Sequence, residues 1–328
     1  MIDYQKTTVY VTGGAGLVGS HLVDLLVKRG ARPIVLDDLS RPGRRNIQGH
    51  IEMGNVAYLD TADLRRSVPQ LERGAVVFHL AARVTNIQAN ARDHLGMLQD
   101  NLLINANVVE ALRRSRPSLA VLASTVCVYP HDAPVPTSEE DAWPYRPEPT
   151  NEGYGLAKAM LEKQAEYLHR ECGVPVVVTR FSNAIGLRDY YDHGSSHVVP
   201  ALIRRIVDGE DPLRVWGSGN QTRVFVDASD LAQAVVDLAD CPAAHDARPV
   251  NIGHDREISI RDLAYMVAEE CGKPDLRIFF DTSYPDGHAR RAVDNARLQS
   301  LIGWVPDTPL ETSIAYMVRE YKNGGAHL

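Results

Sequence analysis

The sequence has few cysteines and few aromatic residues. Cysteine occurs four times in 328 residues, and Phe, Trp and Tyr together make up 6% of the chain. Cys127, Cys172, Cys241 and Cys271 are scattered, with no CxxC pair and no other spacing typical of a metal site. This pattern argues against a disulfide framework and against a bound metal, and it fits a reducing compartment.

The chain also lacks long runs of one kind of residue. It has no segment rich in Lys and Arg and a formal net charge of -7, so a nucleic-acid partner is not expected. No apolar run is long enough to cross a bilayer, so we expect no membrane partner. The N-terminus leads almost at once into an expected strand and lacks the apolar core of a signal peptide, so we expect a cytoplasmic protein.

A glycine-rich loop lies between an apolar strand, expected over residues 8–12, and a helix expected from about Ser20 to Arg29. The loop contains Gly13, Gly14, Gly16 and Gly19, which satisfy both GxGxxG and GxxGxxG. Such glycines allow a tight turn and the close approach of a pyrophosphate to a helix N-terminus. The position of this loop therefore predicts a dinucleotide site.

An acidic pair ends the next expected strand, residues 33–36. Asp37 and Asp38 lie about 20 residues past the glycines, where a carboxylate binds the ribose hydroxyls of NAD and repels the 2′-phosphate of NADP. We therefore predict NAD as the cofactor. Binding of NADP stays open as an alternative, because three basic residues follow the acidic pair: Arg41, Arg44 and Arg45.

Strands and helices alternate through the first half of the chain. Further strands are expected over residues 56–60, 76–82, 119–124 and 174–181, and helices from about residue 63, over 94–115 and over 154–172. This order predicts an α/β fold with a doubly wound parallel sheet. Ligands of such sheets bind at the carboxyl ends of the strands, where the glycine loop and the acidic pair both lie.

A Tyr and a Lys stand four residues apart on the helix expected over 154–172. Tyr154 and Lys158 then share one helix face, where the ammonium favours the phenolate and lets the Tyr act as a base nearer neutral pH. Thr125, which follows the strand 119–124, can pass a proton to the same substrate oxygen. Beside a hydride acceptor these groups suit the oxidation of an alcohol to a ketone, although YxxxK by itself also occurs on structural helices.

The alternation becomes irregular after residue 181. Short strands are expected around a glycine-rich turn at 217–219, with several further helices. The strands are expected over 213–216 and 223–226, and the helices over 197–207, 229–239, 260–271 and 310–321. We predict a smaller, mixed C-terminal lobe that binds substrate, and a proline-rich loop, residues 130–150, over the active site.

In their order, the glycine loop, Asp37, the Ser124-Thr125 pair and YxxxK resemble the motifs of the extended short-chain dehydrogenases/reductases, and among them the nucleotide-sugar epimerases. The resemblance covers nearly the whole chain. It implies a Rossmann domain over residues 1–181, with 227–253 packed back on it, and a nucleotide-sugar-binding lobe over 182–328. It also implies a nucleotide-diphosphate sugar as substrate and a homodimer.

The resemblance assigns site residues as well. It implies that the diphosphate is held by Asn183 and by arginines, whose planar guanidinium forms several hydrogen bonds with phosphate. The expected cofactor-binding residues are Gly13, Gly16, Leu17, Val18, Gly19, Asp37, Asp38, Ser40, Asp60, Thr61, Leu80, Ala81, Ala82, Tyr154 and Lys158. The expected substrate-binding residues are Ser124, Asn183, Val198, Arg205, Trp216, Arg223 and Arg290.

Cys127 and His197 narrow the expected chemistry. The residues after Thr125 are not the Asp-Glu or Ser-Glu pairs of sugar 4,6-dehydratases and UDP-glucuronate decarboxylases. Cys127 with the following Tyr129-Pro130 resembles GDP-fucose synthases and GDP-mannose 3,5-epimerases, and His197 lies in a segment that resembles the former group. Inverting a carbon beside a C4 ketone needs a base on one face and an acid on the other, which this pair can supply. The alternative is structural: a buried thiol and a helix N-terminal His.

The favoured hypothesis is an isomerase, an NAD-dependent nucleotide-sugar epimerase that acts through a transient 4-keto sugar. Cys127 and His197 then exchange protons at C3, C5 or both. One alternative is a 4-epimerase that uses C4 hydride transfer alone. Another is an epimerase-reductase like GDP-fucose synthase that consumes NADPH, against which Asp37 argues. A protein that only senses a dinucleotide has no need of Thr125, Tyr154 and Lys158.

Overall fold

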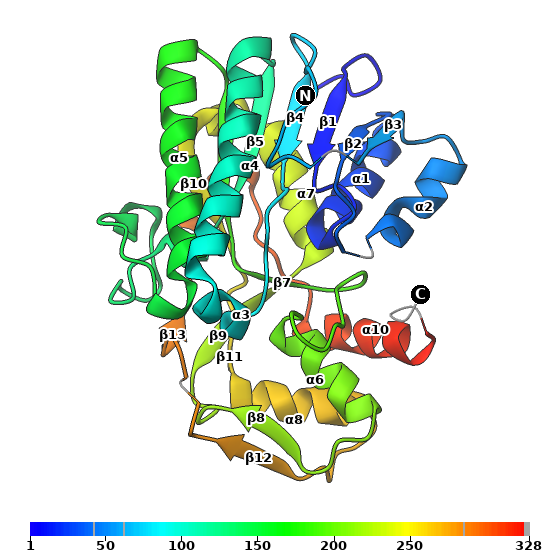
Figure 1. Ribbon diagram of the computed structural model, residues 1–328, viewed down its shortest axis with the longest axis vertical. Coiled ribbons are helices and arrows are strands. Elements are labelled where there is room, and N and C mark those ends of the chain that lie inside the picture. Colours follow the sequence, from blue (N-terminus) through cyan, green and yellow to red (C-terminus); the bar gives the residue numbers. More distant parts are fainter. Residues whose placement is uncertain (42, 62, 285, 325–328) are drawn as a thin grey trace.

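A seven-stranded sheet in the order β10-β6-β5-β4-β1-β2-β3 forms the centre of the computed structural model, which describes the chain except for residues 42, 62, 285 and 325–328 (Figure 1). The strands are β1 (Val9–Thr12), β2 (Ile34–Leu36), β3 (Tyr58–Asp60), β4 (Val76–His79), β5 (Leu119–Thr125), β6 (Val176–Phe181) and β10 (Asp246–Ile252). Each neighbouring pair runs parallel. The predicted doubly wound α/β fold is confirmed.

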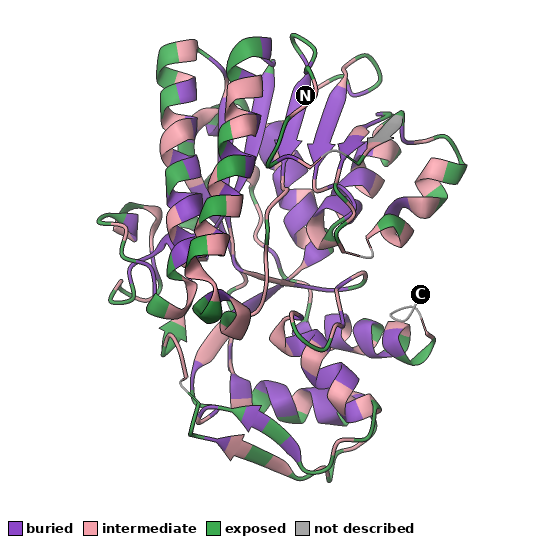
Figure 2. Cartoon of the chain, in the orientation of Figure 1, coloured by how far each residue is buried: buried purple, intermediate pink, exposed green. Residues whose placement is uncertain are grey.

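Alternating side chains of the strands face two separate hydrophobic cores. Val9 and Val11 lie in one core with helices α1 (Leu17–Lys28) and α7 (Ala228–Ala239). Tyr10 lies in the other with helices α4 (His94–Ser115) and α5 (Glu152–Cys172). Because successive strand residues point to opposite faces, the sheet is buried on both sides. Figure 2 shows the central strands of the main sheet buried and the outer faces of α4 and α5 exposed.

The strands β1 and β4 lie side by side at the centre of the sheet, although β2 and β3 come between them in the sequence. From β1 the chain moves outward through β2 and β3, and from β4 it moves outward the other way through β5 and β6. The loops that follow β1 and β4 therefore diverge and leave a crevice at the carboxyl ends of the strands. Gly13 follows β1 and Leu80 follows β4, so both predicted cofactor segments lie at this crevice.

The remaining elements form a smaller lobe at the carboxyl end of the sheet (Figure 1). A four-stranded sheet contains β7 (Asn183–Ile185), β9 (Thr222–Asp227), β11 (Glu257–Ser259) and β13 (Arg290–Arg291), and a second sheet pairs β8 (Leu213–Trp216) with β12 (Ile278–Asp281). Buried residues of α6 (Val198–Val207), α8 (Ile260–Glu270) and α10 (Leu310–Lys322) form its core. Strand β10 and helix α7 come from this half of the sequence but pack on the main sheet.

One expected helix is wrong, and three of the described helices, α2 (Arg44–Glu52), α3 (Ile87–Arg92) and α9 (Ala296–Ile302), were not expected. No helix begins at Asp63, because its carboxylate accepts hydrogen bonds from the Arg65 backbone and guanidinium and so forms a local turn. Helix α2 lacks an apolar stripe, since Ile47 is its one buried residue. The other short elements are the 3-10 turns η1 (Val126–Val128), η2 (Glu139–Ala142), η3 (Pro149–Asn151) and η4 (Pro242–Ala244).

Candidate active site

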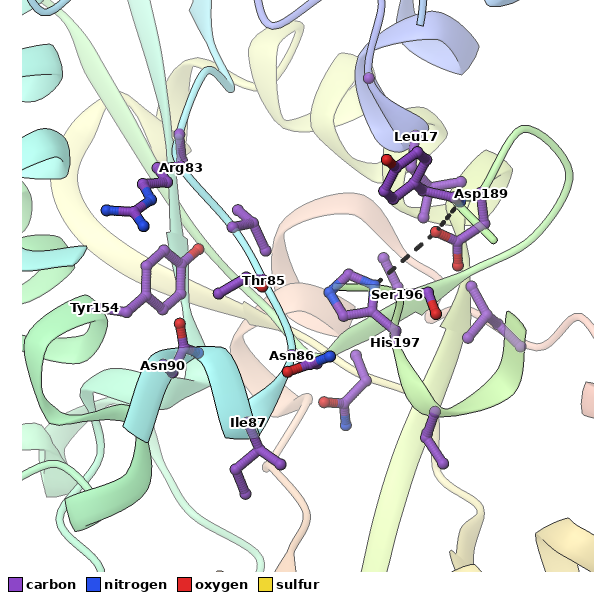
Figure 3. Close-up of a pocket in the computed structure, with 18 of the residues that line it drawn as sticks. Leu17, Arg83, Thr85, Asn86, Ile87, Asn90, Tyr154, Asp189, Ser196 and His197 are labelled. Atoms are coloured by element: carbon purple, nitrogen blue, oxygen red, sulfur yellow. Dashed lines mark hydrogen bonds and ion pairs between the residues drawn. The ribbon is translucent and has the colours of Figure 1, made fainter. Parts of the chain in front are cut away.

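A cavity of about 1750 Å³ lies between the carboxyl ends of the main sheet and the C-terminal lobe. It exceeds the roughly 300–1,000 Å³ usual for one drug-sized ligand, so a dinucleotide and a second ligand have room together. The five predicted catalytic residues all line it: Thr125, Cys127, Tyr154, Lys158 and His197. Figure 3 shows Tyr154 and His197 projecting into this space from different elements.

Two glycines allow the backbone to close around the dinucleotide end of the cavity. Gly13 has a φ of +71°, and a Cβ there would lie 2.7 Å from the backbone nitrogen of Ala81. A Cβ on Gly19 would lie 2.0 Å from the carbonyl oxygen of Gly13. Only glycine fits at either position. This tight glycine turn places the N-terminus of α1, which begins at Leu17, on the cavity wall, where backbone N–H groups can bind a pyrophosphate.

Most of the predicted cofactor residues line this end of the cavity. They are Gly13, Gly16, Leu17, Val18, Gly19, Asp37, Asp38, Ser40, Leu80, Ala81 and Ala82. Asp60 and Thr61 lie at the end of β3 and are not among the described lining residues, whereas Asp63, Leu64 and Arg65 are. The turn after Thr61 therefore approaches the cavity through residues that the sequence did not single out.

The Asp37 carboxylate is fixed at the end of β2. Its two oxygens accept hydrogen bonds of 3.0 Å from the backbone nitrogens of Ala15 and Leu39. Burial raises the pKa of Asp37 above the ordinary carboxyl value, and the two hydrogen bonds oppose that rise. The neighbouring Asp38 is exposed. An acceptor held in this place suits the ribose hydroxyls of NAD.

Tyr154 and Lys158 extend from α5 toward the end of β5. Lys158 is buried, and its Nζ donates a hydrogen bond of 2.7 Å to the carbonyl oxygen of Ala123. The same Nζ lies 6.0 Å from the centre of the Tyr154 ring. Burial lowers the pKa of Lys158 to about 8 and raises the pKa of Tyr154, with the nearby Cys127 adding to the rise. The predicted lowering of the Tyr154 pKa is therefore not found, because burial outweighs a cation at this distance.

A tight turn presents the thiol of Cys127 to the cavity. Thr125 ends β5, and its Oγ1 accepts a hydrogen bond of 3.2 Å from the backbone nitrogen of Cys127, which caps η1. The Cys127 Sγ lies 3.5 Å from Nη1 of Arg291. The thiol thus lies beside a guanidinium on the wall that it shares with Tyr154.

His197 occupies the N-cap position of α6, and its side chain is 35% exposed, toward the cavity. Its Nδ1 lies 3.9 Å from Oδ1 of Asp189 (Figure 3). Burial, followed by the charge of Arg41, lowers the pKa of His197 to about 4. The imidazole is therefore neutral at pH 7 and has a free lone pair with which to accept a proton.

The predicted phosphate arginines are only partly brought to the cavity. Arg223 and Arg291 lie opposite each other in the ladder of β9 and β13, and both line the cavity. Burial and then the neighbouring Arg291 lower the pKa of Arg223 to about 10. Arg290 instead pairs with Glu257 at 2.9 Å, outside the lining, because neighbouring strand residues point to opposite faces. The structure thus brings Arg291 to the place predicted for Arg290.

The other predicted substrate residues also line the cavity: Ser124, Asn183, Val198, Arg205 and Trp216. Trp216 stacks on Tyr284 with ring centres 4.8 Å apart, and both rings are more than a third exposed. Such paired rings offer a flat surface to a planar ligand. Arg205 lies near the end of α6, and its guanidinium already donates a hydrogen bond to Glu210 in the loop that follows.

A buried network that the sequence did not reveal supports the ends of β5 and β6. Glu162 accepts hydrogen bonds of 2.9 and 2.7 Å from Arg180, and both side chains are at most 3% exposed. Ser124 donates a hydrogen bond of 2.5 Å to Glu162, and Arg180 donates to the Tyr129 hydroxyl at 3.0 Å. The pair fixes Ser124 and Tyr129 on either side of the segment that carries Thr125 and Cys127.

Comparison with known proteins agrees with this geometry. Residues 9–253 match the model of the NAD dependent epimerase/dehydratase family. The chain belongs to this family. It is 34% identical to the GDP-L-fucose synthase of Sinorhizobium fredii over 316 residues, which cover 94% of this chain and 93% of that protein. It is 36% identical to a putative GDP-L-fucose synthase 2 of rice, Oryza sativa subsp. japonica, with coverage of 97% and 87%.

A solved structure of a nucleotide-sugar epimerase is similar in fold. The UDP-glucose 4-epimerase of Thermotoga maritima, determined with UDP-glucose, superposes with a TM-score of 0.82 and 26% identity over 97% of this chain and 99% of that one. The chain is therefore an enzyme of this NAD-dependent family. Among the described residues, no helix is long and apolar enough to cross a membrane, and no group of side chains has the makeup of a metal site.

Proposed function

We propose that the enzyme is a nucleotide-sugar epimerase that inverts C3, C5 or both beside a transient C4 ketone. The observation that carries this proposal is that Cys127 and His197 line the same cavity as Tyr154 and Lys158. One bound sugar then has acid-base groups for its C4 hydroxyl and further ones for the carbons next to C4. The names of the curated relatives support a GDP-linked sugar as the substrate.

Tyr154 acts at the C4 hydroxyl. NAD, which the glycine loop and Asp37 would hold, would supply the hydride acceptor for C4 and, once reduced, the hydride donor that restores it. Tyr154 takes the hydroxyl proton as the ketone forms and gives it back when the ketone is reduced. The Thr125 hydroxyl binds the same oxygen, and Lys158, anchored to Ala123, stabilises the phenolate with its positive charge.

Cys127 and His197 act on the carbons beside the ketone. The neutral imidazole of His197 accepts a proton from one face, so the C–H bond breaks and the electron pair is delocalised onto the C4 oxygen as an enolate. The Cys127 thiol then delivers its proton to the same carbon from the other face, which forms the new C–H bond. Exchange with solvent afterwards restores the thiol and the neutral imidazole, so the sugar is inverted with no net oxidation.

A second function, an epimerase that ends in net reduction of the ketone, is supported by a specific observation. Several of the relatives are named GDP-L-fucose synthase, at 30–36% identity over most of the chain. Against it, the Asp37 carboxylate lies where a 2′-phosphate would approach. A redox-neutral epimerase that retains NAD fits this carboxylate better.

The test is turnover of GDP-, UDP- and dTDP-linked hexoses, with NAD or NADPH, followed by proton NMR of the sugar and absorbance at 340 nm. The proposal expects an epimerised sugar without net consumption of cofactor, whereas stoichiometric oxidation of NADPH on a 4-keto sugar would establish the reductase. Tyr154→Phe is expected to lose about 10²- to 10⁴-fold in rate. Tyr316→Phe is the matched control on an exposed part of α10, outside the cavity, and is expected to keep full activity. Full activity in Tyr154→Phe would contradict the mechanism.

We also propose a homodimer formed through α4 and α5. Each of these helices exposes large apolar side chains: Leu95 and Leu103 on α4, and Met160 and Tyr167 on α5. Apolar groups gathered on two adjacent, packed helices suit a helix–helix interface. Light scattering is expected to give twice the chain mass, and Leu103→Glu together with Met160→Glu is expected to give a monomer.

A further inference from the structure

Asp189 and His197 form an acid–imidazole pair on the segment that joins β7 to α6. The Asp189 side chain is 3% exposed, and its Oδ1 lies 3.9 Å from His197 Nδ1 (Figure 3). About 1 Å of side-chain movement separates the two groups from a hydrogen bond. Both residues line the cavity, but the imidazole is 35% exposed, whereas the carboxyl is almost fully buried.

The Asp189 carboxyl is only half satisfied. Its Oδ1 accepts a hydrogen bond of 2.7 Å from the backbone nitrogen of Tyr190. Its Oδ2 is buried and has no hydrogen-bond partner among the described residues. A buried carboxylate oxygen without a donor is costly, so such a group in a native protein calls for an explanation. A neighbouring imidazole that gains positive charge during the reaction supplies one.

Several charged and titratable groups act on the pair. Arg41 lies over the Tyr190 ring at 5.2 Å from its centre and acts electrostatically on both Asp189 and His197. Tyr191 and Glu320 interact electrostatically with Asp189. Burial raises the pKa of Asp189 to about 7 and lowers that of His197 to about 4, so burial disfavours the charged form of each group. Above about pH 7 the pair is a carboxylate beside a neutral imidazole, and the carboxylate can stabilise an imidazolium that forms during the reaction.

We propose that Asp189 is a positioning residue for His197. Its carboxylate accepts the Nδ1–H, which fixes the ring so that Nε2 is left for the sugar, and it stabilises the imidazolium that forms when Nε2 takes the proton from carbon. The carboxylate does not touch the substrate and acts through the imidazole alone. The inference rests on the proposed function in one point, that His197 exchanges a proton with the sugar.

The first test observes His197 directly and needs no turnover. In protein labelled with 15N-histidine, the His197 signals are assigned by their loss in His197→Gln, and their shifts report the tautomer and the titration. At pH 8, above the Asp189 pKa of about 7, the wild type is expected to carry the proton on Nδ1. In Asp189→Asn this preference for the Nδ1–H tautomer is expected to weaken, because a neutral amide oxygen accepts a weaker hydrogen bond than a carboxylate. Asp192→Asn, the same change on the same loop, is the control and is expected to leave the tautomer as in the wild type.

The second test measures deuterium entry from solvent into the sugar. Asp189→Asn is expected to exchange about 10- to 1,000-fold more slowly than the wild type, with unchanged NAD affinity and a KM within about twofold. A wild-type His197 protonated on Nε2 at pH 8, or an unchanged tautomer in Asp189→Asn, would overturn the pairing. Absence of exchange in the wild type with every nucleotide sugar would refute the proposed function, while the NMR result would still decide the pairing.

Discussion

Lys158 donates a hydrogen bond of 2.7 Å to the carbonyl oxygen of Ala123. This bond joins the catalytic helix α5 to the end of β5, two residues before Thr125. It also holds a buried ammonium whose pKa burial lowers to about 8, with Glu162 opposing the shift. The charge that the active site requires is therefore held at a cost to folding.

That cost predicts how stability changes with pH. The folded protein releases the Lys158 proton at about pH 8, whereas the unfolded chain keeps it to about 10.5. Between these values the unfolded state binds more protons, so the free energy of unfolding of the wild type rises with pH relative to Lys158→Met, by up to about 3 kcal/mol. Urea unfolding of both proteins at pH 7, 8, 9 and 10 measures this difference. A difference that stays constant over the whole range would refute the assignment.

The two adjacent arginines of β13 predict opposite results. Arg291 lines the cavity beside Cys127 and opposite Arg223, so Arg291→Met is expected to raise the KM for a nucleotide sugar about 10- to 100-fold. Arg290 pairs with Glu257 outside the cavity, so Arg290→Met is expected to stay within about twofold of the wild type. Steady-state kinetics of the two variants side by side gives the comparison. Equal effects on KM would show that the strand does not direct Arg291 to the substrate.

The buried pair of Arg180 and Glu162 predicts a large effect on stability. Arg180→Met leaves the Glu162 carboxylate buried without its cation, and this is expected to cost about 3–5 kcal/mol in the free energy of unfolding. The exposed pair of Arg170 and Glu166 is the matched control, and Arg170→Met is expected to cost less than about 1 kcal/mol. Denaturant unfolding measures both. A cost for Arg180→Met no greater than the control would mean that Glu162 is balanced in another way.

The Asp37 carboxylate predicts the choice of cofactor. Asp37→Asn keeps the shape of the side chain but removes its charge, so NAD is expected to bind about 10- to 100-fold more weakly. The 2′-phosphate of NADP is no longer repelled, so the affinity for NADP is expected to rise. Isothermal titration with NAD and NADP measures both affinities. Asp132→Asn, an exposed acid outside the cavity, is the control and is expected to leave both affinities unchanged. An Asp37→Asn variant that discriminates like the wild type would show that Asp37 does not select the cofactor.

The fold of the first half could be predicted because its strands are apolar on both faces and alternate with amphipathic helices. Strand β10 was not expected, since Arg248 and Pro249 interrupt its apolar pattern. Proline is tolerated there because β10 is the edge strand of the sheet. Helix α2 was also not expected, because Ile47 is its one buried residue and it carries no apolar stripe.

For the candidate site, the sequence placed some residues at the cavity but did not identify others. Motif spacing brought Tyr154, Lys158, Cys127 and His197 to one cavity. It did not distinguish Arg290 from Arg291, because a shift of one residue in a strand reverses the face that a side chain reaches. The sequence suggested that the loop containing Asp189 shapes the sugar pocket, but it did not indicate that Asp189 lies beside His197, because that contact depends on how a loop without regular structure folds.

In the proposed mechanism, Cys127 and His197 exchange protons at a carbon beside the C4 ketone. Proton NMR and mass spectrometry of a GDP-hexose incubated in deuterated water with NAD would detect this exchange. We expect deuterium at C3 or C5 of the inverted sugar with the wild type, and a loss of that exchange by about 10²-fold or more in Cys127→Ser. An inverted sugar that contains no deuterium, formed equally fast by Cys127→Ser, would contradict it and would indicate C4 hydride transfer alone.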